Sequence, residues 1–304
     1  MARLTPIFKI MLVQAAAAML CVSGFTAFAH ADQRVVSIGG DLTEIIYALG
    51  KEGSLVATDT TSVYPAAALA TPKVGYVRQL SAEGVLSVEP DTILISGAAG
   101  PPQALEQLRA AGITLVELPT EYTIEAIFEK IDVVSTTLGA DEKGTALKAK
   151  VVRDWAQAQS AISALPRDLS ALFFTTLNDG APRAAGTQTA AHGLIDLLSA
   201  RNVFADRTGY KGISLEAAVA ADPDIIMVMD RYAQSAGGVS AIKNHPAISL
   251  TTAAKKDRII LVDAVQAMQF GPRTPAAVGR LATFIRANLR GKSAAALPAR
   301  TAVK

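Results

Sequence analysis

Apolar blocks and amphipathic stretches alternate along residues 34–290, and this pattern predicts strands and helices in turn. The apolar blocks have the length of buried strands, and Gly50 and Gly112 end two of the stretches with helical spacing. Such alternation predicts parallel sheets covered by helices. We expect strands at 34–38, 54–58, 92–95, 114–117, 171–175, 225–229 and 259–262, a turn at 39–41, and helices at 43–49, 102–111, 189–198 and 239–244, after Ser81, at Leu215, and from Thr274 as N-cap with Pro275 in the first helical position.

Residues 141–165 break this alternation. Apolar residues recur there at helical spacing, with Trp155 among them, until Pro166 ends the run. A helix of this length would extend roughly 35 Å, enough to join two lobes. The fold expected is therefore α/β, with two Rossmann-like lobes at 32–139 and 166–290, one spanning helix at 140–165, a ligand cleft between the lobes and a flexible tail at 291–304.

One pattern occurs twice and supports two lobes. Residues 81–95 and residues 214–228 both read Ser-x-Glu, a short helical stretch, acid-Pro-Asp and an apolar strand. Ligands prefer the crevice where such repeated units meet.

The first 31 residues resemble a secretory signal peptide. Arg3 and Lys9 precede the apolar run 10–22, and Ala29-His30-Ala31 fits a cleavage site. A retained membrane anchor fits less well because the run is shorter than the roughly 20 residues that span a bilayer. Cys21, the one cysteine, follows Leu20, whereas a lipid-attachment cysteine usually follows a small residue. We expect a mature chain that is neither membrane-inserted nor a lipoprotein.

Composition narrows the function of the mature chain. Without residues 1–31, 27 basic and 27 acidic residues remain, so nucleic acid and anionic membrane surfaces are not expected partners. No disulfide or thiolate metal site is expected without a cysteine. Only His192 and His245 remain for a site that binds a bare metal ion, which is too few. Nucleophile-elbow, phosphate-loop and zinc-protease motifs are absent from the sequence, so an enzyme is not expected.

Three further segments carry a family resemblance. Residues 74–84 read Val-Gly-Tyr-Val-Arg-Gln-Leu-Ser-Ala-Glu-Gly, residues 235–238 read Ser-Ala-Gly-Gly after Asp230-Arg231, and residues 270–275 read Phe-Gly-Pro-Arg-Thr-Pro. With the two lobes, they resemble the periplasmic substrate-binding proteins of ABC importers for cobalamin, ferric siderophores and haem, and most specifically the haem-binding HmuT/ShuT/PhuT group. The resemblance implies a monomeric periplasmic protein that carries haem b as transported cargo to a permease dimer with its ATPase.

Tyr76 is the candidate ligand of the haem iron. A phenolate is a hard anionic ligand suited to ferric iron, and tyrosine is a known haem ligand. A tyrosine ordinarily titrates near pH 10, so a nearby guanidinium would help. Arg78 and Arg231 are candidates for that role or for binding propionates. Taken without the resemblance, Tyr76 reads more simply as an exposed loop tyrosine.

Other residues are expected to contact the ligand. Tyr210 lies six residues before Glu216, much as Tyr76 lies seven before Glu83, and it would form a wall for the porphyrin or a second ligand. His192 lies near a helix start that would border the cleft, although a lone histidine is more often a surface or cap residue. Arg273 is a further cleft candidate from the resemblance.

Glu83 and Glu216 begin matched helices, one in each lobe. The resemblance implies that they meet arginines of the permease dimer, where charges on a rim steer docking and register. Alternatively, each carboxylate only complements the helix macrodipole.

Two alternative functions remain open. The same scaffold could bind a ferric siderophore or cobalamin, although Trp155 lies on the spanning helix and not in the predicted cleft. A sensor or adhesion module without transport would also fit the sequence.

Overall fold

The N-terminal lobe is built on a four-stranded parallel sheet. The computed structural model describes residues 33–177 and 182–291, so the predicted signal peptide lies outside the described residues, as do residues 292–304 of the predicted tail. The strands are ordered β2-β1-β5-β6 and comprise Leu55–Thr58, Val35–Ile38, Thr92–Ser96 and Thr114–Leu118. The central strands β1 and β5 read as apolar runs because both faces of the sheet are covered there.

Helices cover this sheet on both faces. One core includes residues of α2 (Gly40–Ala48) and α5 (Ile124–Thr137). The other includes residues of α3 (Ala82–Leu86), α4 (Pro102–Ala110) and the small hairpin of β3 (Gly75–Tyr76) and β4 (Gln79–Leu80). Short 3-10 turns lie at Glu52–Ser54 and Ala66–Ala70.

The C-terminal lobe has a mixed sheet of order β10-β8-β7-β11-β12, with β9 beside β7. The parallel strands are β7 (Ser170–Thr176), β11 (Ile225–Met229), β12 (Ile259–Val262) and β9 (Arg201–Asn202). β8 (Arg183–Ala185) pairs antiparallel with β7 on one side and with β10 (Tyr210–Gly212) on the other. One core includes residues of α7 (Ala190–Leu197), α13 (Ala264–Ala267) and α14 (Thr274–Leu289), and the other includes residues of α8 (Leu215–Ala221), α9 (Asp230–Ser235), α10 (Val239–Lys243), α11 (Pro246–Ser249) and α12 (Thr252–Lys255).

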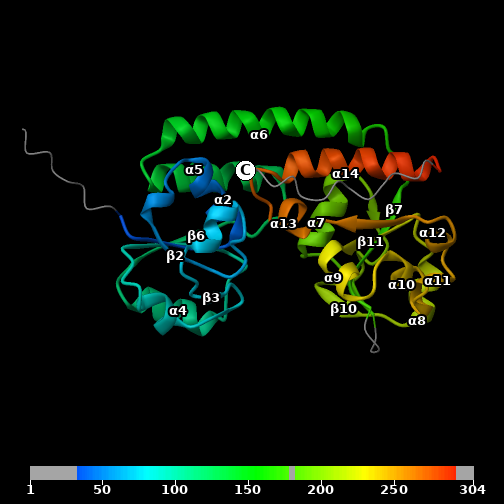
Figure 1. The fold of residues 1–304 in the computed structure, drawn as a ribbon, viewed down its shortest axis with the longest axis horizontal. Helices are drawn as coiled ribbons and strands as arrows, with labels where there is room; N and C mark the ends of the chain where they lie inside the picture. Colours follow the sequence, from blue (N-terminus) through cyan, green and yellow to red (C-terminus); the bar gives the residue numbers. More distant parts are fainter. Residues whose placement is uncertain (1–32, 178–181, 292–304) are drawn as a thin grey trace, which may run out of the picture. The chain divides into compact units, whose positions relative to one another are not determined.

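One helix joins the lobes. α6 (Asp141–Ile162) runs along both of them and contacts α5 at one end and α14 at the other (Figure 1). Val151 packs into the core of the first lobe, Ile162 into a core of the second, and Trp155 packs against both. The predicted two-lobed α/β fold with a spanning helix is confirmed. Among the described residues, no helix is long and apolar enough to cross a membrane.

Two local predictions were wrong, and several elements were not predicted. Gly40 and Asp41 belong to α2 instead of a turn, and only Gly39, at φ 136°, keeps the turn conformation. Thr274 lies inside α14, where it is buried and donates to the Gln266 carbonyl, so Arg273 is the N-cap residue. α5 was not predicted, although its buried face repeats at helical spacing.

The repeated sequence motif has the same structure in both lobes. Ser81 and Ser214 are N-caps whose hydroxyls accept from the amides of Gly84 and Ala217. Glu89 and Asp222, which precede the prolines, both have positive φ. The carboxylates of Asp91 and Asp224 accept from the backbone amides of Arg34 and Ser170, respectively. Arg34 lies just before β1, and Ser170 is the first residue of β7.

Candidate functional site

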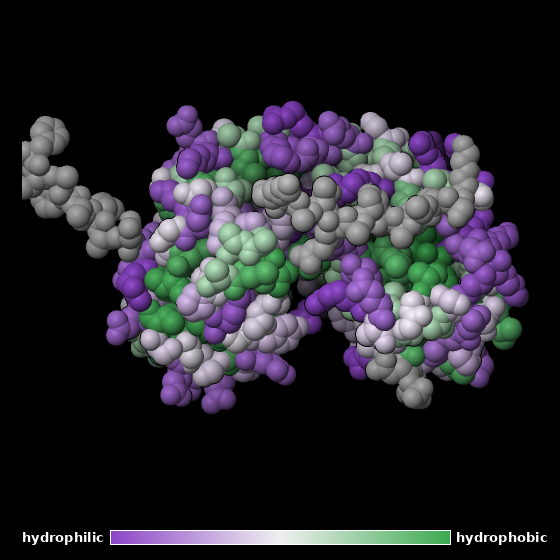
Figure 2. Space-filling view, viewed as in Figure 1, coloured by the Kyte–Doolittle hydropathy of each residue, from purple (hydrophilic) through white to green (hydrophobic). Residues whose placement is uncertain are grey.

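A cavity of about 630 Å³ lies between the two lobes, within the size range of small-molecule sites. Figure 2 shows the hollow that separates the lobes on this face. Its wall comes largely from segments that follow the carboxyl ends of parallel strands, where α/β sheets bind ligands. These segments lie within residues 39–41, 60–63, 96–98, 119–122, 175–176, 229–231 and 264–269.

Tyr76 reaches the cavity from the β3–β4 hairpin. The hairpin turn is Val77-Arg78, and the buried Val77 anchors it to the core of the lobe. Backbone hydrogen bonds hold the hairpin on two sides, from the Thr60 amide to the Gly75 carbonyl and from the Gly100 amide to the Val77 carbonyl, both 2.9 Å. Tyr76 is nevertheless 40% exposed. A rigid hairpin therefore presents an accessible phenol to the cavity.

The loop before the hairpin is fixed by two charged residues. Lys73 Nζ donates to Thr58 Oγ1 and to the carbonyls of Ser62 and Ala68, at 2.7, 3.0 and 2.9 Å. Burial lowers the pKa of Lys73, and the nearby Asp59 acts in the opposite direction. The carboxylate of Asp59 also accepts from the Gly39 amide, which connects this loop to the start of α2.

Tyr210 lies on the opposite wall, at the start of β10. Its ring packs against the core of the C-terminal lobe, and burial raises the pKa of the phenol. Hydrogen bonds with the Ala191 amide and Thr189 lower it, as does the charge of Arg78 from the other lobe. The oxygen of Tyr210 is therefore held at the start of α7, within electrostatic reach of the Tyr76 hairpin.

Three arginines give the cavity a positive wall. Arg78, Arg183 and Arg231 line it, and none of them forms an ion pair with an acidic side chain of the described residues. Arg183 Nη2 donates to the Tyr210 carbonyl at 2.7 Å. The Lys130–Asp41 pair, also in the wall, is buried and self-neutralising at 2.7 Å. The positive charge of the three arginines favours a ligand with carboxylates.

Two predicted contact residues lie outside the cavity wall. His192 is held by its ring nitrogens, with Nδ1 3.2 Å from Asn202 Nδ2 and Nε2 3.3 Å from Asp196 Oδ2. Burial raises the pKa of Asp196, and His192 opposes this shift. Arg273 is paired with Glu44 at 2.7 Å. Both side chains are bound to protein partners, so the expectation that they contact the ligand finds no support in the cavity wall.

Glu83 and Glu216 also lie outside the wall, as exposed residues in the first turns of α3 and α8. Hydrogen bonds from its own amide and from Ser214 lower the pKa of Glu216. Their position leaves both carboxylates accessible to a partner.

Several wall residues were not predicted from the sequence, among them Arg183, Tyr122, Met229, Met268 and Gln269. The signal for Tyr122 and Met229 was available, because each lies at or just beyond the carboxyl end of a predicted strand. Arg183 carried no such signal, since it lies on a three-residue strand. Within the described residues, no cluster of three or more His, Cys, Asp or Glu side chains could hold a bare metal ion.

The chain is similar to proteins of known family. A family model described as periplasmic binding protein matches residues 35–265. The solved structure of the periplasmic heme-binding protein BhuT in complex with two hemes is 37% identical, with a TM-score of 0.80, and the alignment covers 84% of this chain and 99% of that chain. The uncharacterized ABC transporter substrate-binding lipoprotein YvrC of Bacillus subtilis (strain 168) is 27% identical over 256 residues, 83% of this chain and 80% of that protein. A vitamin B12-binding protein of Vibrio cholerae is 25% identical over 256 residues, 84% of this chain and 89% of that protein.

Proposed function

The chain belongs to the periplasmic binding protein family, and we propose that it binds haem between its lobes and delivers it to an ABC permease of the inner membrane. The observation that carries this proposal is the Tyr76 hairpin, which presents an accessible phenol and Arg78 to one cavity. In the proposed complex the oxygen of Tyr76 binds the ferric iron. Tyr210 forms part of the facing wall, and the solved relative that binds two hemes supports the choice of ligand.

The arginines suit the propionates of haem. Haem carries two carboxylates, and Arg78, Arg183 and Arg231 offer guanidinium groups that no acidic side chain of the described chain neutralises. The side chains of the corrin ring of cobalamin are largely amides, which gain less from such a wall. Cobalamin remains the second candidate because one relative is a vitamin B12-binding protein.

The transport role includes a docking step. Glu83 and Glu216 are exposed, lie outside the cavity wall and begin equivalent helices. We place them at the contact with arginines of the permease dimer, where a carboxylate steers association. The similarity to an ABC transporter substrate-binding lipoprotein supports such a partner. Export through a signal peptide at residues 1–31 and a monomeric state belong to this proposal, and it includes no catalytic reaction.

A hemin titration tests the function. The purified protein should give a high-spin ferric spectrum with a phenolate charge-transfer band, and should bind hemin more tightly than cyanocobalamin. The same titration with Arg78→Ala/Arg231→Ala separates the two ligands, because only the affinity for the carboxylate-bearing ligand should fall strongly. Tighter binding of cyanocobalamin by the wild type would replace haem with cobalamin as the cargo.

A further inference from the structure

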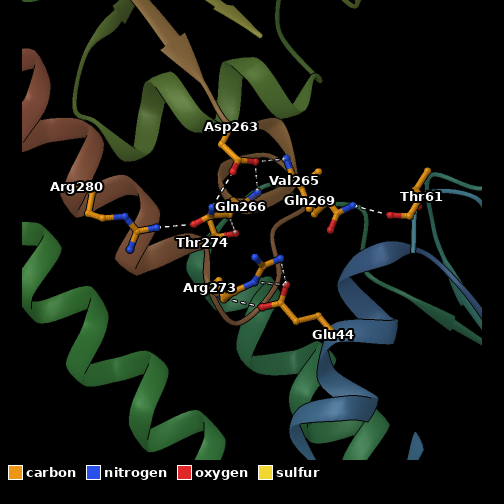
Figure 3. Close-up of polar contacts among 9 residues, drawn as sticks. All are labelled: Glu44, Thr61, Asp263, Val265, Gln266, Gln269, Arg273, Thr274 and Arg280. Atoms are coloured by element: carbon orange, nitrogen blue, oxygen red, sulfur yellow. Dashed lines mark hydrogen bonds and ion pairs between the residues drawn. The ribbon is translucent and has the colours of Figure 1, made fainter. Parts of the chain in front are cut away.

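A short segment of the C-terminal lobe reaches across to the N-terminal lobe. Residues 269–273, here called the clasp segment, connect α13 to α14 and contact α2 and the loop at Thr61 (Figure 3). Phe270 is fully buried in the core of the N-terminal lobe, and its ring centroid lies 5.1 Å from that of Tyr122. The segment is therefore anchored in the lobe that faces its own.

Arg273 and Glu44 form the charged part of this contact. The Arg273 amide donates to Glu44 Oε1 at 2.9 Å, and Nε and Nη2 meet Oε2 at 2.9 and 2.7 Å. The side chain of Glu44 is only 5% exposed. The guanidinium also lies over the ring of Tyr64, 3.2 Å from its centroid. Three contacts from one arginine to a buried carboxylate fix the position and the orientation of the segment.

Gln269 links the clasp segment to the ligand cavity. Its Nε2 donates to the Thr61 carbonyl of the other lobe at 2.9 Å, and both residues line the cavity. The contact is tight, because a Cβ on Gly40 would lie 2.4 Å from Gln269 Nε2. Movement of the clasp segment would therefore shift both walls of the cavity.

We propose that residues 269–273 clasp the two lobes at the spacing that the ligand requires, and that Glu44 and Arg273 are positioning residues for haem binding. This proposal rests on the proposed function. Neither residue lines the cavity, so each acts through the segment and through Gln269 and Thr61. Removing one partner of a buried ion pair leaves an uncompensated charge, which favours displacement of the segment from α2.

A double-mutant cycle tests the clasp in the full chain. Glu44→Gln, Arg273→Met and the double variant should each weaken hemin affinity on the order of tenfold, within the usual range of coupling between sites. The double variant should bind no more weakly than the single variants, because all three break the same contact. The charge-transfer band of bound hemin should keep its position, since Tyr76 is unchanged. Arg273→Lys should restore part of the affinity.

The matched control is Arg280→Met. Arg280 Nη2 donates to Gln266 Oε1 at 2.6 Å, but both residues belong to the C-terminal lobe (Figure 3). This variant should bind hemin like the wild type. If Arg273→Met instead changes affinity additively with Glu44→Gln, or if all variants bind like the wild type, the clasp is wrong.

Amide exchange of the ligand-free protein separates this proposal from the function. The clasp predicts faster exchange within residues 40–48 and 264–274 in Glu44→Gln and Arg273→Met, at temperatures well below unfolding, and no such change in Arg280→Met. Faster exchange in these two variants, together with a wild type that binds no hemin, would leave the clasp in place and remove haem as the ligand. Unchanged exchange in both variants would overturn the clasp even if hemin binds.

Discussion

The two lobes share a scaffold and differ in the tyrosines that line the cavity. Each lobe has the serine-capped helix, the acidic residue with positive φ before proline and the aspartate bound to an amide by a neighbouring strand. Tyr76 lies on a two-strand hairpin and is 40% exposed, whereas Tyr210 is partly buried against the core of its lobe. The repeat thus preserves the frame, while the proposed iron ligand lies in one lobe and the proposed porphyrin wall in the other.

Exchanging each tyrosine for phenylalanine gives the largest expected contrast. Tyr76→Phe should weaken hemin binding more than about 100-fold, since loss of an outer-shell partner of a metal ligand already costs 10–100-fold. It should also abolish the phenolate charge-transfer band. Tyr210→Phe keeps the ring and should change affinity less than about tenfold. Titrations followed by absorbance would measure both, and equal losses in the two variants would contradict the division of roles.

Charge reversal of the two rim glutamates tests whether the lobes dock alike. Glu83→Lys and Glu216→Lys should each impair haem uptake in vesicles reconstituted with the permease, because a carboxylate facing an arginine becomes a like-charge clash of several kcal/mol. Hemin affinity in solution should stay unchanged, since neither residue lines the cavity. Normal uptake by the double variant would assign both residues to the helix ends alone.

Replacing Arg78 or Arg231 should change hemin affinity by amounts that differ less than those of the two tyrosine variants. Arg78 lies in the turn that follows Tyr76, and its positive charge also lowers the pKa of Tyr210. Arg78 is therefore close to both tyrosines of the cavity. Arg78→Ala should weaken hemin binding roughly tenfold, equivalent to one pKa unit or about 1.4 kcal/mol. The loss should grow at low pH, where protons compete with iron for the phenolate. Arg231→Ala, in the other lobe, should have a smaller effect. A titration from pH 6 to 8 that gives the two variants identical affinities would contradict this order.

The sequence was sufficient for the frame of the protein because buried parallel strands read as apolar runs. The spanning helix was also predictable, because its apolar residues recur at helical spacing, and its Trp155 packs against cores of both lobes. Short antiparallel strands such as β8 and β10 bury little surface, and they escaped prediction. Ligand contact by Tyr76, Arg78, Tyr210 and Arg231 stays a prediction, although all four line one cavity.

The roles of Arg273 and His192 depend on partners that the sequence does not reveal. Glu44 precedes Arg273 by 229 residues, and its pairing depends on how the lobes come together. His192 is held by Asn202 and Asp196, which are close in sequence, yet no motif marks that arrangement. Resemblance located the important segments, whereas the structure was needed to separate residues of the wall from residues that hold the lobes.

The repeated aspartates should affect stability unequally. Asp224 Oδ2 accepts from the Ser170 amide and hydroxyl, and the Asp224 amide donates to Ser170 Oγ. The Asp91 carboxylate accepts from the Arg34 amide, in an exposed position. Asp224→Ala should lower the free energy of unfolding by about 2 kcal/mol and Asp91→Ala by less than about 1 kcal/mol. Urea unfolding of both variants measures this, and equal losses would mean that the two copies contribute alike.

The smallest expected effect is a decrease in the free energy of unfolding at alkaline pH, caused by the ionisation of Tyr210. Burial raises the pKa of Tyr210 above its ordinary value of 10. The contribution of the protonated phenol to the free energy of unfolding is therefore fully present below pH 10. It is lost as the pH rises through the pKa of Tyr210 in the folded protein. At pH 8, Tyr210→Phe should be less stable than the wild type by about 1 kcal/mol, because the Ala191 amide loses an acceptor. Between pH 10 and 11 the wild type should lose more stability than the variant, so the difference should narrow. Urea unfolding of the ligand-free proteins at pH 8 and pH 11 would test this, and a constant difference would mean that Tyr210 titrates alike in the folded and unfolded chains.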